Sequence, residues 1–129
     1  MKYLVANWKM NLINSKNWIN DFNNNFNDLS LNDDLTIVIC PSYLQLSEFS
    51  QNHLSKINFS IGAQNVSENN SGAFTGEISA EHLTEFSEVS YCIVGHSERR
   101  SAGETDAMIK AKVKQLLTKN IKMLLKIVE

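Results

Sequence analysis

A lysine follows the first apolar run of the sequence, two residues beyond an asparagine. The segment Ala6-Asn7-Trp8-Lys9 comes directly after strand formers at residues 2–6, and an extended backbone would point Asn7 and Lys9 to the same side. A cation at the carboxyl end of a parallel strand lies where such folds bind ligands, and its ammonium suits a phosphate or a developing oxyanion. The alternative is that Lys9 is an ordinary surface residue at a strand end.

A histidine follows a second apolar run, Tyr91 to Val94, through a single glycine. Gly95 permits a sharp exit from a strand, and Ser97 can cap a helix that begins after it. His96 would then lie near a helix N-terminus, where the dipole favours the neutral imidazole, which can donate a hydrogen bond to a carbonyl. The alternative is a structural histidine bonded to nearby backbone.

Two further motifs are less specific. The sequence from Gly72 to Glu77 (GAFTGE) lies within the one long connection, Asn65 to Ile78, and has an aromatic residue and a threonine between two glycines. It predicts either a shaped tip that docks on a partner or a merely flexible loop. The charged residues Glu98, Arg99 and Arg100, taken by themselves, are typical of a solvated ion-pair cluster.

Alternating strands and helices must position these residues. Strands are expected at residues 2–6, 36–40, 58–63, 91–94 and 121–128, and helices after Ser15, after Pro41, after Ser79 and around residues 109–117. This alternation predicts βαβ units and a parallel sheet in one domain spanning residues 1–129, and near-continuous apolar strands predict a sheet covered on both faces. An open doubly wound sheet and part of a (β/α) barrel both fit the pattern.

Composition limits the classes of function. The chain has 129 residues, 43% of them hydrophobic and 20% charged, and a net charge of -2 that mixes both signs, which argues against a nucleic-acid surface. No stretch approaches the ~20 apolar residues of a membrane span, and the polar N-terminus is unlike a signal peptide, so we expect a cytoplasmic protein without membrane partners. We expect Cys40 and Cys92 to be buried thiols, with no disulfide and no metal site.

Taken together, the motifs resemble one family. The order NWKMN after the first strand, GAFTGEIS in the long loop, and VGHSERR then GETD after the fourth strand is similar to triosephosphate isomerase from Lys2 to Glu104, and more loosely to Glu129. NWK alone is a weak signal, whereas GAFTGEIS followed by VGHSERR is a strong one. The resemblance implies a (β/α)8 barrel, of which this chain would supply about four βα units and a fifth strand, and it implies no cofactor.

The family interconverts dihydroxyacetone phosphate and glyceraldehyde 3-phosphate through an enediolate. The resemblance implies that His96 polarises the substrate carbonyl and shuttles protons between its oxygens. It implies that Lys9 holds the substrate and stabilises the developing negative charge, with Asn7 positioning beside it. Glu98 resembles the acid that contacts the Lys9 region. A neutral histidine at a helix N-terminus is itself a known feature of this family.

The resemblance also has implications for assembly and for what is missing. Phe74 and Thr75 resemble the tip of the loop that reaches a partner subunit's active site, which implies a homodimer. The family's general base is a glutamate after strand six, and nothing in this chain matches it; Glu129 resembles a different family glutamate. The lid and the later phosphate-binding loops have no match either. Lys126 stands where the family buries a small thiol.

These departures lead to three expectations. The first is an isomerase half that is inactive alone, because a base must remove a carbon-bound proton. The second is a truncated non-catalytic remnant, or a half-barrel kept as an assembly module. The third is a portion of an ordinary full-length enzyme.

Overall fold

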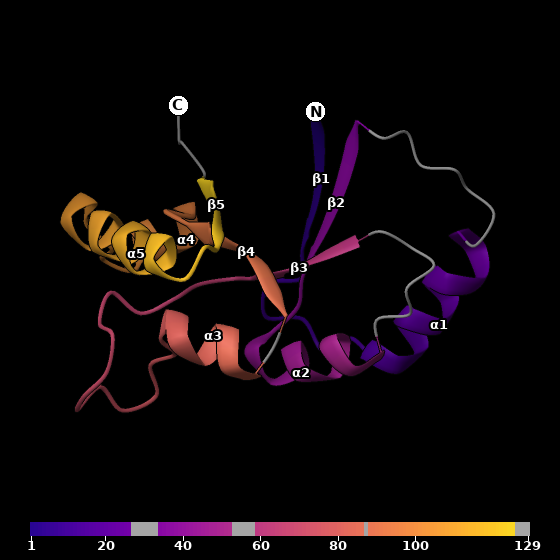
Figure 1. The fold of residues 1–129 in the computed structure, drawn as a ribbon, viewed down its shortest axis with the longest axis horizontal. Coiled ribbons are helices and arrows are strands. Elements are labelled where there is room, and N and C mark those ends of the chain that lie inside the picture. Colours follow the sequence, from indigo (N-terminus) through magenta and orange to yellow (C-terminus); the bar gives the residue numbers. More distant parts are fainter. Residues whose placement is uncertain (27–33, 53–58, 87, 126–129) are drawn as a thin grey trace.

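Five strands form one parallel sheet whose spatial order is the order of the chain. A computed structural model describes residues 1–26, 34–52, 59–86 and 88–125. The strands are β1 (Lys2–Asn7), β2 (Leu35–Cys40), β3 (Phe59–Ala63), β4 (Val89–Val94) and β5 (Lys122–Leu125), in the order β1-β2-β3-β4-β5. A doubly wound sheet reverses its order at a switch point. The sequential order and the curl of the sheet in Figure 1 therefore identify part of a (β/α) barrel.

Helices alternate with the strands, as the sequence predicts, with one difference. The helices are α1 (Ser15–Phe26), α2 (Tyr43–Asn52), α3 (Ala80–Phe86), α4 (Ser97–Ser101) and α5 (Asp106–Thr118). The difference lies between β4 and β5, where the helix start predicted beside Ser97 belongs to a separate short helix, α4, and the helix predicted around residues 109–117 is α5. The expected strand residues Asn58 and 126–128 lie outside the described residues.

The middle strands present two different apolar faces. Val38 and Cys40 of β2 pack with Tyr91 and Ile93 of β4 on the concave inner face. The alternate residues of the same strands pack against the helices, as expected because successive strand side chains point to opposite faces. Cys40 belongs to the inner cluster and Cys92 to the outer one. Both are free and buried, which confirms the prediction of two core thiols.

An aromatic cluster anchors the helices to the outer face near β1. The ring of Trp8 lies 5.4 Å from that of Trp18 and 5.2 Å from that of Phe49, centroid to centroid. Phe22 stacks on Trp18 at 4.9 Å and meets Phe59 edge-on at 5.4 Å. Such pairs add to the area that these rings bury, so the residue just before Lys9 is held in a rigid setting.

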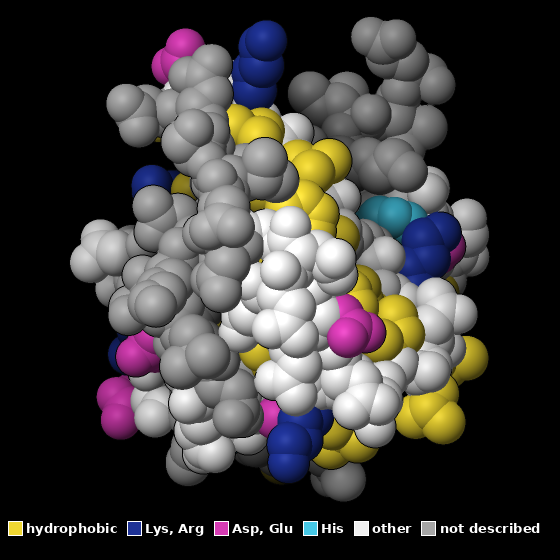
Figure 2. Space-filling view, turned by 90° about the vertical axis from the view of Figure 1, so that its right-hand side faces the viewer, with side chains coloured by type: hydrophobic (Ala, Val, Ile, Leu, Met, Phe, Trp, Pro, Cys, Tyr) yellow, Lys and Arg dark blue, Asp and Glu magenta, His cyan; other side chains and the backbone are white. Residues whose placement is uncertain are grey.

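Strand β1 does not follow the prediction that both faces of the sheet are covered. Tyr3, Leu4 and Val5 are 47%, 57% and 38% exposed. The burial prediction is therefore wrong for β1, because β1 is an edge strand and pairs only with β2 in the described structure. Figure 2 shows that hydrophobic side chains reach the surface in a band on one face of the molecule.

Close packing at β3 explains a glycine in the middle of the sheet. A Cβ atom added to Gly62 would lie 2.5 Å from the Cys40 sulfur and 2.9 Å from a methyl carbon of Val38. Neighbouring β2 side chains therefore occupy the space that any side chain at position 62 would need.

Candidate active site

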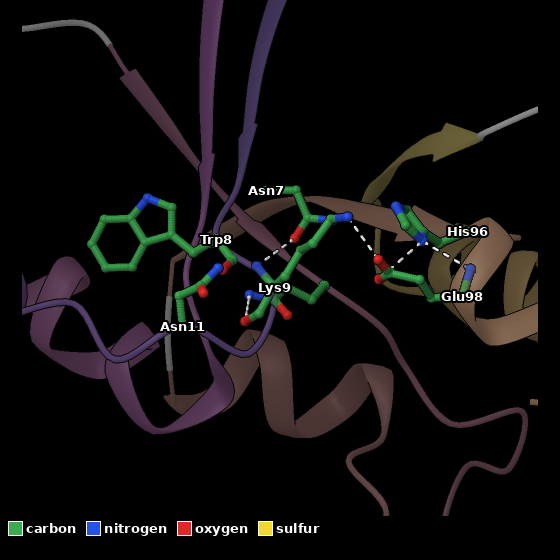
Figure 3. Close-up of polar contacts among 7 residues, drawn as sticks. Asn7, Trp8, Lys9, Asn11, His96 and Glu98 are labelled. Atoms are coloured by element: carbon green, nitrogen blue, oxygen red, sulfur yellow. Dashed lines mark hydrogen bonds and ion pairs between the residues drawn. The ribbon is translucent and has the colours of Figure 1, made fainter.

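The backbone turns sharply where β1 ends. β1 stops at Asn7, Trp8 is buried with 6% exposure, and Lys9 adopts a left-handed conformation with φ of 54°. The Asn7 side chain accepts a 2.9 Å hydrogen bond from the Lys9 amide, and Asn11 donates one of 2.7 Å to the Trp8 carbonyl. The expectation of an extended backbone from Asn7 to Lys9 is therefore wrong. Figure 3 shows Trp8 pointing into one side of the fold and Lys9 reaching toward His96 and Glu98 on the other.

Gln64, just after β3, holds this turn in place. Its side-chain nitrogen donates hydrogen bonds to the carbonyl of Lys9 at 2.9 Å and to the carbonyl of Cys40 at 3.0 Å. One amide thus joins the ends of β1, β2 and β3. The role of Gln64 is not predicted from the sequence, because a single glutamine in a loop belongs to no recognisable motif.

His96 caps the short helix α4. Gly95 leaves β4 with φ of 69°, and His96 Nδ1 accepts a 3.2 Å hydrogen bond from the backbone amide of Glu98. The predicted helix cap was Ser97; the structure assigns that position to His96, and Ser97 is the first helical residue. Nδ1 therefore serves as an acceptor, which leaves Nε2 as the ring nitrogen able to donate.

Glu98 lies between the lysine and the histidine. Its Oε1 accepts a 2.6 Å hydrogen bond from Lys9 Nζ, and its Oε2 lies 3.4 Å from His96 Nδ1. The hydrogen bond from the Glu98 amide to the same nitrogen is shorter, at 3.2 Å, so backbone and side chain of Glu98 both contact the ring. The Lys9 and Glu98 side chains are 51% and 58% exposed. An ion pair in water adds little stability, so its main effect is to orient Lys9.

The half-buried Arg100 of α4 supports the turn at Gly95. Arg100 Nε donates to the Gly95 carbonyl at 3.2 Å, and its Nη1 lies 2.8 Å from Asp106 at the start of α5. The guanidinium therefore does more than join a solvated charge cluster, because it fixes the backbone from which His96 projects.

A buried ion pair lies behind the site. Lys112 of α5 pairs with Glu104, and its ammonium also donates to Asn65 at 2.8 Å. The side chains of Lys112 and Glu104 are 5% and 2% exposed. Among the described residues, the second carboxylate oxygen of Glu104 is buried without a hydrogen-bond partner. Asn65 adjoins Gln64, so this pair connects α5 to the loop that holds Lys9.

The thiols of the sheet are poor nucleophiles. Burial raises the pKa of Cys40 to about 12, and burial, with a smaller effect of Cys40, raises the pKa of Cys92 above its usual range. A reactive cysteine needs an accessible thiolate. Neither thiol supplies one at neutral pH.

Phe74 and Thr75 lie apart from the other candidate residues. The long loop between β3 and α3 projects away from the sheet (Figure 1), and both residues are exposed near its tip. Backbone bonds from Phe74 to Gly72 and from Glu77 to Phe74 give the tip a defined turn. The structure thus brings together Asn7, Lys9, His96 and Glu98, and leaves Phe74 and Thr75 on a separate projection. Lys126 and Glu129 lie outside the described residues.

Two kinds of feature are absent from the described ranges. Residues 1–26, 34–52, 59–86 and 88–125 contain no group of three or more His, Cys, Asp or Glu side chains arranged to hold a metal ion. Within the same ranges, no helix has the length and apolar character needed to cross a membrane.

Comparison with known proteins decides the family. The family model for triosephosphate isomerase matches residues 2–129. The chain belongs to the triosephosphate isomerase family. Among curated members of that family, the isomerase of Mycoplasmopsis pulmonis is 40% identical over 116 residues, covering 86% of this chain and 46% of the relative. That of Idiomarina loihiensis is 44% identical over 112 residues, covering 84% and 42%.

A third triosephosphate isomerase, from Mycoplasma mobile, is 37% identical over 125 residues, covering 93% of this chain and 50% of the relative. The chain thus spans about half the length of the curated relatives it matches. The half-barrel of β1 to β5 is the corresponding part of the triosephosphate isomerase fold.

Proposed function

We propose that this chain supplies the carbonyl-polarising part of a triosephosphate isomerase site. The reaction is the interconversion of dihydroxyacetone phosphate and glyceraldehyde 3-phosphate in glycolysis and gluconeogenesis, in the cytoplasm. The observation that carries the proposal is the convergence of Lys9 and His96 on Glu98. The two residues come from opposite parts of the sheet, β1 and β4, yet both contact one carboxylate.

The tautomer of His96 suits the chemistry. Isomerisation builds negative charge on a carbonyl oxygen as a proton leaves the adjacent carbon, and catalysis needs donors aimed at that oxygen. His96 keeps its proton on Nε2, because Nδ1 accepts from the Glu98 amide. A neutral imidazole can donate this proton and recover it at the second oxygen. The Lys9 ammonium supports the same negative charge and the substrate phosphate.

The base that removes the carbon-bound proton is the missing element of this proposal. The Glu98 carboxylate is paired with Lys9 at 2.6 Å, so it is poorly placed to take a proton from substrate. In the family this role belongs to a glutamate after strand six. We therefore propose that residues 1–129 alone do not turn over substrate, and that activity needs the remaining strands.

A chimera tests this proposal directly. Residues 1–129 would be fused to the C-terminal half of the Mycoplasmopsis pulmonis isomerase and assayed with a coupled dehydrogenase. We expect isomerase activity in the chimera, loss of at least about 10²-fold in kcat for His96→Gln and for Lys9→Met, and no activity from residues 1–129 alone. A folded but inactive chimera would refute the proposed function. Activity of residues 1–129 that disappears in His96→Gln would refute the dependence on further strands.

We also propose that the loop of residues 64–79 makes the enzyme a homodimer. Support comes from the exposure of Phe74, which is 44% exposed on a projecting loop with a defined turn. Sedimentation of the chimera tests it. A dimer that becomes a monomer in Thr75→Arg is expected, and a dimer unchanged by Thr75→Arg combined with Phe74→Asp would contradict it.

The exposed apolar residues of β1 favour one other function, a non-catalytic assembly module. An unpaired strand edge with apolar side chains invites pairing with another chain. The coupled assay separates the two functions, because a module would gain no activity from the C-terminal half.

A further inference from the structure

The first turn of α3 is closed by a reciprocal pair between Ser79 and His82. Ser79 Oγ accepts from the backbone amide of His82 at 3.3 Å, and His82 Nδ1 accepts from the backbone amide of Ser79 at 3.2 Å. The hydroxyl also lies 2.8 Å from Nδ1. This is the geometry of a capping box, in which a glutamate or glutamine usually supplies the second acceptor. Here a titratable imidazole takes that place.

The hydrogen bond from the Ser79 amide requires a ring with no proton on Nδ1, whereas the 2.8 Å contact with the hydroxyl can be donated from either side. A ring nitrogen that accepts from an amide has no proton, and it becomes a donor when the ring is protonated. Protonation would therefore leave the Ser79 amide without its acceptor, and Ser79 is only 5% exposed. A positive charge at a helix N-terminus is also unfavourable. We propose that the Ser79–His82 pair is a proton-sensitive latch, which fastens the long loop to α3 at neutral pH and releases it on acidification.

The base of the loop lies directly beside the latch. The backbone amide of Ser67 donates a 2.7 Å hydrogen bond to the carbonyl of Ile78, the residue before Ser79. This bond closes the base of the loop. Ser79 and His82 also line a small cavity of about 50 Å³ together with Phe74 and other loop residues. Ser79 therefore lies next to the hydrogen bond that closes the loop, and it shares a cavity with Phe74 near the tip.

Charged groups around His82 act in the opposite direction but weakly. Among the residues that the structure describes, titratable neighbours include Glu77 of the loop, Glu81 and Glu85 of α3, Tyr43 of α2, and Lys119 of α5, which pairs with Glu81 at 3.2 Å. The carboxylates favour an imidazolium, yet they are exposed and screened by water and salt. Burial raises the pKa of Tyr43 above its usual range, so its phenol stays neutral. The amide of Ser79, a residue only 5% exposed, opposes them, because it faces the same ring nitrogen.

Amide hydrogen exchange of the ¹⁵N-labelled chain tests the latch at pH 5 and pH 8, as protection factors corrected for intrinsic rates. His82→Gln keeps an acceptor that does not titrate, and His82→Met removes the acceptor at every pH. We expect the wild-type protein to match the Gln variant at pH 8 and the Met variant at pH 5. The expected loss of protection is about fivefold at the Ser79 amide and in the loop. Amides of α5 serve as the internal control and should not change.

Two outcomes overturn the proposal. One is a wild-type pH profile parallel to that of His82→Gln. The other is a tautomer with the proton on Nδ1 at pH 8, read from the side-chain ¹⁵N shifts of His82. The tautomer measurement needs no variant, so it decides the matter even where His82→Met does not fold.

Discussion

The side-chain amide of Gln64 donates a 2.9 Å hydrogen bond to the carbonyl of Lys9, a residue far from it in the sequence. Lys9 has a left-handed backbone with φ of 54°, a conformation that costs free energy unless its surroundings hold it. The second hydrogen bond of Gln64, to Cys40 in β2, fixes the donor itself. The direction of the Lys9 side chain thus depends on the end of β3.

Replacing Gln64 with Met should release the turn at Lys9. The change keeps the side-chain length but removes both hydrogen bonds, so we expect a loss of about 1–3 kcal/mol in the free energy of unfolding, measured by urea denaturation. Gln115→Met is the matched control, because its amide makes one long hydrogen bond of 3.4 Å. Equal losses in the two variants would show that the turn is not held by Gln64.

Breaking the buried ion pair should cost more than removing it. Lys112→Met leaves the Glu104 carboxylate buried without its partner, and we expect about 3–5 kcal/mol of destabilisation. The double variant Glu104→Leu/Lys112→Met should be more stable than Lys112→Met. Lys119→Met, which breaks the exposed pair with Glu81, should cost less than about 1 kcal/mol. The coupling between Glu104 and Lys112 would be contradicted if the losses of the single variants Glu104→Leu and Lys112→Met add up to the loss of the double variant.

Any side chain at position 62 should strain the inner face of the sheet. Gly62→Ala places a methyl group 2.5 Å from the Cys40 sulfur and 2.9 Å from Val38, so we expect a destabilisation of about 1–3 kcal/mol by thermal unfolding. Cys40→Ala in the same chain should recover part of the loss. A Gly62→Ala protein with unchanged melting temperature would mean that β2 and β3 separate at no cost.

The buried thiol of Cys40 should make stability depend on alkaline pH. Burial raises its pKa from 9.0 to about 12. The thiol therefore loses its proton at a lower pH in the unfolded chain than in the folded one. The contribution of this thiol to the free energy of unfolding is constant below about pH 9. The free energy of unfolding then falls as the pH rises from 9 toward 12. Urea denaturation at pH 8 and pH 10 measures the fall, which Cys40→Ala should reduce. An identical fall in that variant would assign the pH dependence to other groups.

Most of the fold follows from local sequence signals. The helix cap at Ser79 and the aromatic spacing of Trp18 and Phe22 predict α3 and α1, because both signals act within one or two turns. The start of α4 is visible in Gly95 and Ser97, but its cap lies one residue earlier than predicted, at His96, and histidine is not among the usual capping residues. Local patterns do not distinguish a doubly wound sheet from a barrel. The order of the paired strands decides between these two folds.

The site is less predictable than the fold, because its geometry depends on contacts between distant segments. The types and positions of Lys9, His96 and Glu98 are visible in the motifs, whereas the turn that aims Lys9 depends on Gln64. Lys112 looks like a solvated residue on the surface of an amphipathic helix. Its burial follows only from the position of Glu104 and Asn65 in three dimensions.

The order of the sheet has a consequence for how the chain folds during its synthesis. Each strand from β2 to β5 pairs with the strand that precedes it in the chain, so each of these strands meets a partner that is already present when it leaves the ribosome. Contacts between chain neighbours have a low loop-closure cost and form early. The Lys9 turn needs Gln64, and the Lys9–Glu98 contact needs α4. We therefore expect the turn to form before the contact as translation proceeds.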